Sequence, residues 1–373
     1  MIKYPHQAEL FRWNDRRGAM NPAEFDRRVL SWFDTHGRKQ LPWQENPAPY
    51  PVWVSEIMLQ QTQVATVIPY YRRFMDRFPD VQTLASVELD EILGLWAGLG
   101  YYARARHLHQ AARIVCDRHG GEMPLEITAL QELPGIGRST AGAILALAVG
   151  QRQPILDGNV KRLLARFAAV EGWPGQPKVQ ALLWELAERY TPAERVADYT
   201  QAIMDLGALI CMPRRPRCLA CPLVEGCVAH AQGREMDYPS PKPRPELPTR
   251  STRMVLLRSS AGEVLLERRP PVGIWGGLWC FPECPPGVEI ADWCWEQLGL
   301  TVSVGMPWRV LRHGFSHFRL DISPIPATAS EARGTVMDGE RFVWYNTCQL
   351  ENLGIPAPVR LLLTALTTKL AND

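Results

Sequence analysis

Apolar residues from Phe25 onward recur at spacings of three and four, which is the period of a helix with one buried face. One such series is formed by Val179, Leu182, Leu183, Leu186 and Ala187. Proline and glycine interrupt the pattern at short intervals, as between consecutive short helices. Because alternating β-branched runs are nearly absent here, we expect residues 25–231 to form an all-α domain.

The pattern changes after a proline-rich segment at 232–250, whose prolines are Pro239, Pro241, Pro243, Pro245 and Pro248. This spacing favours an extended, semi-rigid linker. Beyond it, short apolar runs predict strands at 254–257, 264–266, 318–322 and 342–345, and helices at 288–298 and 359–370. We therefore expect a smaller α+β domain over 251–373. Residues 1–24 are an N-terminal extension to which we assign no role.

The bulk properties suit a two-domain globular protein, because 373 residues exceed one ordinary core. The formal net charge of +2 means that any basic surface for nucleic acid has to be local. No apolar run approaches the roughly 18 residues of a membrane span, and the first twenty residues lack the apolar stretch of a signal peptide. We therefore expect a cytoplasmic protein with no membrane partner and mostly reduced cysteines.

Four cysteines follow one another in the spacing C-x6-C-x2-C-x5-C, at Cys211, Cys218, Cys221 and Cys227. Zinc ribbons usually pair two C-x2-C knuckles across a longer gap. One knuckle with two outlying cysteines suits an iron–sulfur cubane held by a single loop of 211–227 better, and zinc remains the alternative. The first part of this loop carries Arg214, Arg215 and Arg217, so it favours phosphate contacts over the alternative of a solvated basic turn.

A glycine-containing turn at 133–137 lies between two helical segments. Gly135 and Gly137 permit a tight turn and a close approach of backbone to a ligand. The amides that begin the next helix would favour an anion, so the turn is a candidate phosphate cradle. An ordinary corner between two helices is the competing interpretation.

Two acidic residues are candidates for catalysis. Asp157 follows Gly137 by twenty positions and precedes a helix, so it is predicted to cap that helix, with the amide donors keeping it ionised. Glu56 is surrounded by apolar residues, which would raise its pKa toward neutrality and make it a proton donor. Together they resemble the two-carboxylate arrangement of glycoside cleavage. A plain cap and a solvated side chain are the competing interpretations.

These features resemble the endonuclease III-like, helix-hairpin-helix DNA glycosylases: the hairpin, the aspartate twenty residues on and the cysteine loop. The strings at 55–67, 98–106 and 155–161 resemble the MutY-type adenine DNA glycosylases within that family. The resemblance implies that Glu56 protonates adenine and that Asp157 stabilises the sugar cation, with Asn159 orienting the site. It also implies a [4Fe–4S] cluster on the four cysteines.

The resemblance further implies that a monomer binds duplex DNA holding adenine opposite 8-oxoguanine or guanine. The adenine has to leave the stack before it can react. Tyr101 would wedge into the duplex, and two glutamines would probe the neighbouring bases. The expected DNA contacts are Gln60, Gln61, Leu99, Tyr101, Gly135, Gly137, Ser139, Phe315, Ser316 and His317.

The second domain resembles the Nudix hydrolases, with 275–282 in place, but departs from them in the metal-binding helix. Aligned on Gly299, it keeps only Glu296 of the acidic set, and one carboxylate cannot hold the cations needed for diphosphate cleavage. We therefore expect this domain to recognise a base through the turn at 315–317.

Three other functions compete with a monofunctional adenine glycosylase. One is a glycosylase with lyase activity or another target base. The second is a catalytically silent DNA-binding module with a redox cluster. The third is a nucleotide hydrolase, which the altered helix disfavours. Lyase-type relatives carry a lysine after the hairpin, where this chain has Ser139, so base removal without efficient strand nicking is expected.

Overall fold

The computed structural model describes residues 20–243, 247–315, 317–332, 341–346 and 353–370. The chain divides into two compact units. The first comprises residues up to Gln82 together with those from Gln110 to Pro243. The second comprises Thr83–His109 together with the residues that follow Pro243.

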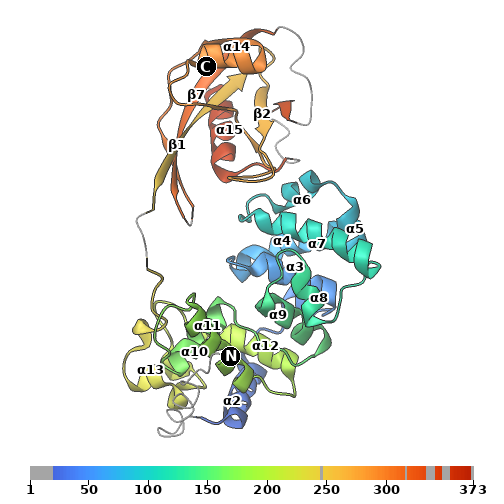
Figure 1. Ribbon diagram of the computed structural model, residues 1–373, viewed down its shortest axis with the longest axis vertical. Helices are drawn as coiled ribbons and strands as arrows, with labels where there is room; N and C mark the ends of the chain where they lie inside the picture. The colour runs from blue at the N-terminus through green and yellow to red at the C-terminus, as the bar shows by residue number, and fades with distance from the viewer. Residues whose placement is uncertain (1–19, 244–246, 316, 333–340, 347–352, 371–373) are drawn as a thin grey trace, which may run out of the picture. The chain divides into compact units, whose positions relative to one another are not determined.

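The described residues 20–243 contain helices and no strand, so the predicted all-α character is confirmed (Figure 1). The longer helices are α2 (Pro22–His36), α3 (Pro49–Leu59), α4 (Val64–Arg77), α5 (Val81–Ser86), α6 (Leu89–Trp96), α7 (Ala103–His119), α8 (Ile127–Glu132), α9 (Arg138–Val149), α10 (Gly158–Phe167), α11 (Pro177–Tyr190) and α12 (Val196–Asp205). Short helical turns are η1 (Pro42–Gln44), η2 (Leu206–Ile210), η3 (Cys218–Ala220), η4 (Val224–Gly226), α13 (Val228–Ala231) and η5 (Glu235–Asp237).

The strands begin at Thr249 and form one mixed sheet with the order β3-β2-β1-β7-β5. Strands β1 and β7 pair in parallel from Thr249 with Arg319 to Arg258 with Thr328. The elements are β1 (Thr249–Arg258), β2 (Val264–Arg268), β3 (Trp279–Cys280), β4 (Glu283–Cys284), α14 (Ile290–Leu298), β5 (Leu300–Val304), β6 (Leu311–Gly314), β7 (Arg319–Ala332), β8 (Phe342–Tyr345) and α15 (Ala357–Leu370).

Alternate residues of β1 face opposite sides of the sheet, as the period of two requires. Met254 and Leu256 belong to a core with α15, and Val255 and Leu257 belong to a second core with α14. One helix therefore covers each face. The predicted α+β fold of this part is confirmed.

The described start of segment 232–250 is less extended than the proline spacing predicts. The turn η5 lies at their start, and Tyr238 is buried. Arg166 on α10 donates to the backbone oxygens of Glu235 and Tyr238 at 2.8 and 3.0 Å. These hydrogen bonds attach the beginning of the segment to the first unit. Its last residues, from Thr249 onward, belong to β1.

Candidate active site

Helix α3 carries Glu56 among apolar neighbours. A proline occupies the first turn of α3, where the backbone N–H has no partner within the helix and its absence removes no hydrogen bond. The buried side chains of the helix include Trp53, Ile57 and Met58. Glu56 itself is partly buried. Burial and, to a smaller extent, the nearby negative charge of Asp157 raise the pKa of Glu56 to about 8. A carboxyl with this pKa holds a proton at neutral pH, as the apolar surroundings predicted.

Asp157 caps α10, because its side chain accepts a hydrogen bond from the amide of Val160 at 2.7 Å. The amides of Asn159 and Val160 lower its pKa, but burial is the largest influence and raises the pKa above the usual value. The expected cap is present. The amide donors favour the ionised form, as the sequence analysis expected, but desolvation outweighs their effect on the pKa.

Asn159 lies between Asp157 and the rest of the site. Its Nδ2 donates to Oδ2 of Asp157 at 3.4 Å, and its Oδ1 accepts from Arg162 at 2.9 Å. Arg162 also donates to the backbone oxygen of Cys211 at 2.7 Å. On the other side, a Cβ added to Gly207 would lie 2.6 Å from Cβ of Asn159. Asn159 is therefore fixed by a cation and by a close backbone.

The predicted hairpin is formed by α8, the turn and α9. Gly135 has φ +83°, a conformation that favours glycine, and Gly137 caps α9. Both glycines are exposed, whereas Ile136 between them is buried and anchors the turn. The exposed amides at the start of α9 can thus meet an anion without moving the core.

Helix α9 brings the hairpin, α3 and the Asp157 loop together. The hydroxyl of Ser139 accepts a hydrogen bond from the amide of Leu156 at 2.9 Å. Nε2 of Gln60, at the end of α3, lies 3.5 Å from Oγ1 of Thr140. Gln61 is exposed and has φ +57°, so the chain leaves α3 through a left-handed turn.

Leu99 and Tyr101 belong to the second compact unit. Leu99 is buried, but Tyr101 is 51% exposed and has φ +51°. A bulky residue in this conformation is uncommon and points to a functional constraint.

The turn at 315–317 lies between β6 and β7, as the strand pattern predicted. Phe315 is half-buried and stacks on Phe318 with ring centroids 4.4 Å apart. His317 is exposed. Ser316 lies outside the described residues.

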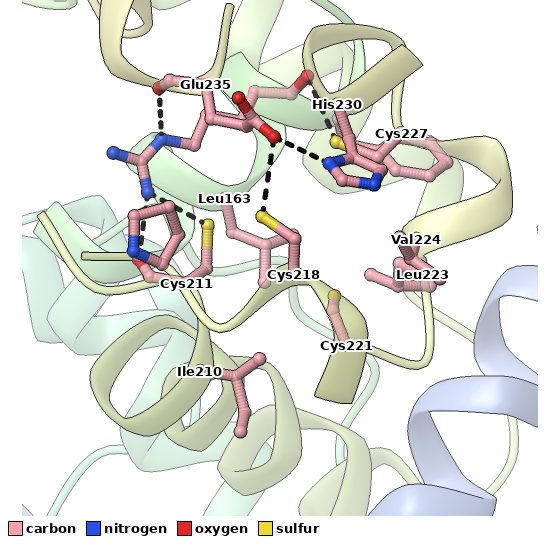
Figure 2. A pocket seen from close by; sticks show the side chains of 13 residues that line it. Leu163, Ile210, Cys211, Cys218, Cys221, Leu223, Val224, Cys227, His230 and Glu235 are labelled. Atoms are coloured by element: carbon pink, nitrogen blue, oxygen red, sulfur yellow. Dashed lines mark hydrogen bonds and ion pairs between the residues drawn. The ribbon is translucent and has the colours of Figure 1, made fainter. Parts of the chain in front are cut away.

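The four predicted cysteines line one pocket (Figure 2). Burial raises the pKa of Cys221 to about 12, so a bound cation is needed to favour its thiolate. Arg166 donates to Sγ of Cys211 at 3.4 Å and to the oxygen of Met212 at 2.8 Å. This buried arginine therefore holds the loop and faces its sulfur.

The positions of possible metal ligands bear on the kind of centre. A tetrahedral zinc with Zn–S bonds of about 2.3 Å requires sulfurs about 3.8 Å apart. Among the described residues, Cys218, His230 and Glu235 form a group of possible ligands within 4.8 Å of one another. The four cysteines are all described, and no three of their sulfurs form such a group.

Sequence analysis did not single out Arg162 or Arg166. Their spacing of four places both on one face of α10, one and two turns after Asn159. That spacing was the available signal, but their partners on the cysteine loop follow 45 or more residues later.

In the described part of the chain, no helix is long and apolar enough to cross a membrane.

Comparison with known proteins identifies the two folds. Residues 54–189 match the model of the HhH-GPD superfamily of base excision DNA repair proteins, and residues 253–365 match that of the NUDIX domain. The chain resembles the solved structure of a thermostable thymine-DNA glycosylase, with a TM-score of 0.50 and 28% identity over 57% of this chain and 97% of that one. The fold and site thus define a helix-hairpin-helix DNA glycosylase with a Nudix-like C-terminal domain.

Two curated relatives narrow this class. The chain is 36% identical to the adenine DNA glycosylase of Buchnera aphidicola subsp. Schizaphis graminum over 342 aligned residues. This alignment covers 91% of this chain and 97% of the relative. It is 36% identical over 329 residues to the human adenine DNA glycosylase, covering 74% of this chain and 60% of that protein. The chain belongs to the adenine DNA glycosylase family. It is a DNA-binding enzyme that hydrolyses N-glycosyl bonds.

Proposed function

We propose that this enzyme removes adenine paired with 8-oxoguanine or guanine in duplex DNA. The observation that carries the proposal concerns Glu56. Its carboxyl has a pKa of about 8, and the negative charge of nearby Asp157 contributes to this raised value. One group that holds a proton and one that can be ionised are what glycosidic cleavage needs.

In this mechanism Glu56 protonates the extruded adenine, which then leaves as a neutral base. Asp157 stabilises the oxocarbenium-like sugar, and Asn159 keeps the carboxylate oriented through its 3.4 Å contact. Water attacks the sugar and completes the hydrolysis. Because general acid catalysis is typically worth about 10²–10⁴-fold, Glu56 carries a large share of the rate.

The proposed DNA contacts belong to both compact units. The amides at Gly135 and Gly137 would hold a phosphate, and Gln60 and Gln61 would face bases near the extruded adenine. Ser139 would contribute to DNA binding indirectly, since its hydroxyl already accepts a hydrogen bond from the amide of Leu156. Exposed Tyr101, next to Leu99, would fill the gap left by the extruded base. That would offset part of the few kcal/mol that unstacking costs.

The turn that carries Phe315, Ser316 and His317 is proposed to recognise the base opposite adenine. His317 is exposed and can donate or accept a hydrogen bond, and Phe315 anchors the turn. The added carbonyl at C8 and the protonated N7 of 8-oxoguanine are an edge that such a short polar turn can read.

Cys211, Cys218, Cys221 and Cys227 are proposed to hold a [4Fe–4S] cluster. Their positions around one pocket and the N–H donor from Arg166 support it. The cluster would fix the loop that carries Arg214, Arg215 and Arg217. A zinc ion on Cys218, His230 and Glu235 is the second candidate, and iron and zinc analysis of the purified protein separates the two.

The proposed function is tested by adenine release. Purified protein is incubated with duplexes that hold adenine opposite 8-oxoguanine, guanine or thymine. We expect free adenine from the first two and little from the third. Equal release from all three would remove the proposed selectivity. Because both acids and all four cysteines come from one chain, we expect a monomer to be active.

A further inference from the structure

The loop at 98–102, which carries Tyr101, has an unfavourable backbone conformation at the tyrosine. Gly98, Gly100 and Tyr101 have φ of +98°, +76° and +51°. Tyrosine does not favour this region, so neighbouring contacts have to maintain it.

Some of those contacts come from the neighbouring helices. Arg104 donates to the carbonyls of Leu99 and Gly100 at 3.3 and 3.0 Å. Nε1 of Trp96 donates to the same Gly100 oxygen at 3.1 Å. The guanidinium of Arg104 also lies 5.4 Å from the centre of the Tyr101 ring. These contacts shape the loop but do not connect it to the sheet.

Other contacts come from C-terminal residues of the same compact unit. The amide of Gly98 donates to the hydroxyl of Tyr102, which in turn donates to the carbonyl of Ile355, both at 3.4 Å. Arg106 donates from Nη1 to the carbonyl of Gly276 at 2.7 Å. The second bond is the shorter one and it involves a charged donor, so it is the stronger of the two connections.

Helix α6 strengthens this attachment. Asp90 pairs with Arg268 of β2 at 2.8 Å. A Cβ added to Gly354 would lie 2.8 Å from Cβ of Leu93, so backbone packs directly on the helix here. The segment with Tyr101 is therefore in close contact with the Nudix-like fold.

The carbonyl bound by Arg106 follows Trp275. The ring of Trp275 lies 5.6 Å from that of Phe315 and 5.7 Å from that of His313. Trp275 itself has φ +54°, so its backbone too is held in an uncommon conformation. The amide of Arg106 donates to the carbonyl of Tyr102 at 3.2 Å, which joins Arg106 to the Tyr101 loop. Its side chain bonds Gly276, whose neighbour Trp275 contacts Phe315 at the β6–β7 turn.

We propose that Arg106 is a positioning residue that fixes Tyr101 relative to the β6–β7 turn. It acts by bonding the carbonyl of Gly276 beneath the aromatic cluster of Trp275, His313 and Phe315. The inference rests on the proposed function, since it assumes that both elements contact the DNA. Its consequence is that selection of the opposite base depends on a residue that contacts neither base.

The test compares Arg106→Met with Arg106→Lys and with Arg113→Met in the full chain. Methionine keeps most of the length and removes the donors, whereas lysine can still donate one hydrogen bond. Arg113 is exposed on the same helix, so its variant controls for lost charge. Two quantities are measured: hydrogen exchange of residues 98–102 without DNA, and the ratio of adenine release opposite 8-oxoguanine to that opposite guanine.

We expect Arg106→Met to exchange residues 98–102 at least tenfold faster, with α9 and α10 unchanged, and to lower the ratio at least fivefold. Arg106→Lys should recover most of both, and Arg113→Met should match the wild type. Faster exchange with an unchanged ratio, or a lower ratio with unchanged exchange, overturns the proposal. If Arg106→Met does not fold, Arg106→Leu, which also lacks a donor, carries the same expectations. If wild-type enzyme releases no adenine, the proposed function fails, while exchange still reports on the Arg106 contact.

Discussion

The hydroxyl of Ser139 accepts a hydrogen bond from the amide of Leu156, one residue before Asp157, at 2.9 Å. This position, just after the hairpin, is where a lyase would need an amine. Here it supports the backbone that leads into the acidic residue. The hairpin helix therefore takes part in placing Asp157.

The first prediction concerns strand cleavage. With a hydroxyl at position 139, no Schiff base with the sugar can form there. We expect adenine release without strand scission at the same pace, measured on one labelled duplex with and without alkali. Scission without alkali as fast as base release would contradict this. Lys161 lies close in sequence to Asp157, so Lys161→Met serves as the control for any slow residual nicking.

The second prediction concerns Glu56→Gln, which keeps the shape of the side chain and removes its proton. Adenine release should fall at least about 10²-fold, in the range typical of general acid catalysis, while DNA binding persists. Single-turnover release and a binding titration on the same duplex measure the two. Near-normal turnover would rule Glu56 out as the acid.

The melting temperature of the Glu56→Gln variant tests the raised pKa of Glu56 without measuring activity. The folded pKa of Glu56, about 8, exceeds the ordinary value of 4.5. The contribution of Glu56 to the stability of the wild-type protein is therefore fully present below pH 4.5 and is lost as pH rises through 8, because a buried carboxylate forms. Gln has no such charge. Glu56→Gln should melt at a higher temperature than wild type at pH 8 and at about the same temperature near pH 4.5.

The third prediction is a pH profile. The proton on Glu56 is lost as pH rises through about 8, so kcat/KM should fall above that value. Asp157 must be ionised, and burial raises its pKa, so the acidic limb should lie above the usual range for aspartate. Steady-state rates between pH 4.5 and 9.5 check both limbs. A profile that stays flat up to pH 9.5 would be incompatible with this assignment of the acid.

The sequence predicted the local features well. The period of three and four located the helices, and an aspartate before a helix predicted the cap at Asp157. It did not predict that segment 83–109 packs with the C-terminal residues. That packing depends on contacts such as Asp90 with Arg268, which are 178 positions apart. Local spacing carries no information about such pairs, and the same holds for Ser139 with Leu156.

The fourth prediction concerns Arg166, which is buried and bonds the cysteine loop and the segment after it. Arg166→Leu removes these donors and leaves several carbonyls without a partner, at about 1–3 kcal/mol for each that stays buried. We expect less iron per chain and a lower melting temperature. Lys161→Leu on the same helix is the control. Full iron content in the Arg166 variant would show that other contacts suffice.

The fifth prediction concerns the β6–β7 turn. Replacing Ser316 and His317 by alanine should spare release opposite guanine but reduce the preference for 8-oxoguanine. The loss of one or two hydrogen bonds corresponds to about 1–3 kcal/mol of discrimination. The measurement is the ratio of release rates on the two duplexes at limiting enzyme. An unchanged ratio in the folded double variant would remove this turn from lesion recognition.

Gly207 has a consequence for how this enzyme can change over generations. A Cβ there would meet not only the side chain of Asn159 but also its backbone carbon and oxygen at 2.9 Å, and backbone cannot swing aside. Even alanine would force Asn159 or the backbone of Gly207 to shift. On the proposed role of Asn159, a one-nucleotide change at this codon would impair base removal, so lineages that acquire it would accumulate errors elsewhere in their genomes.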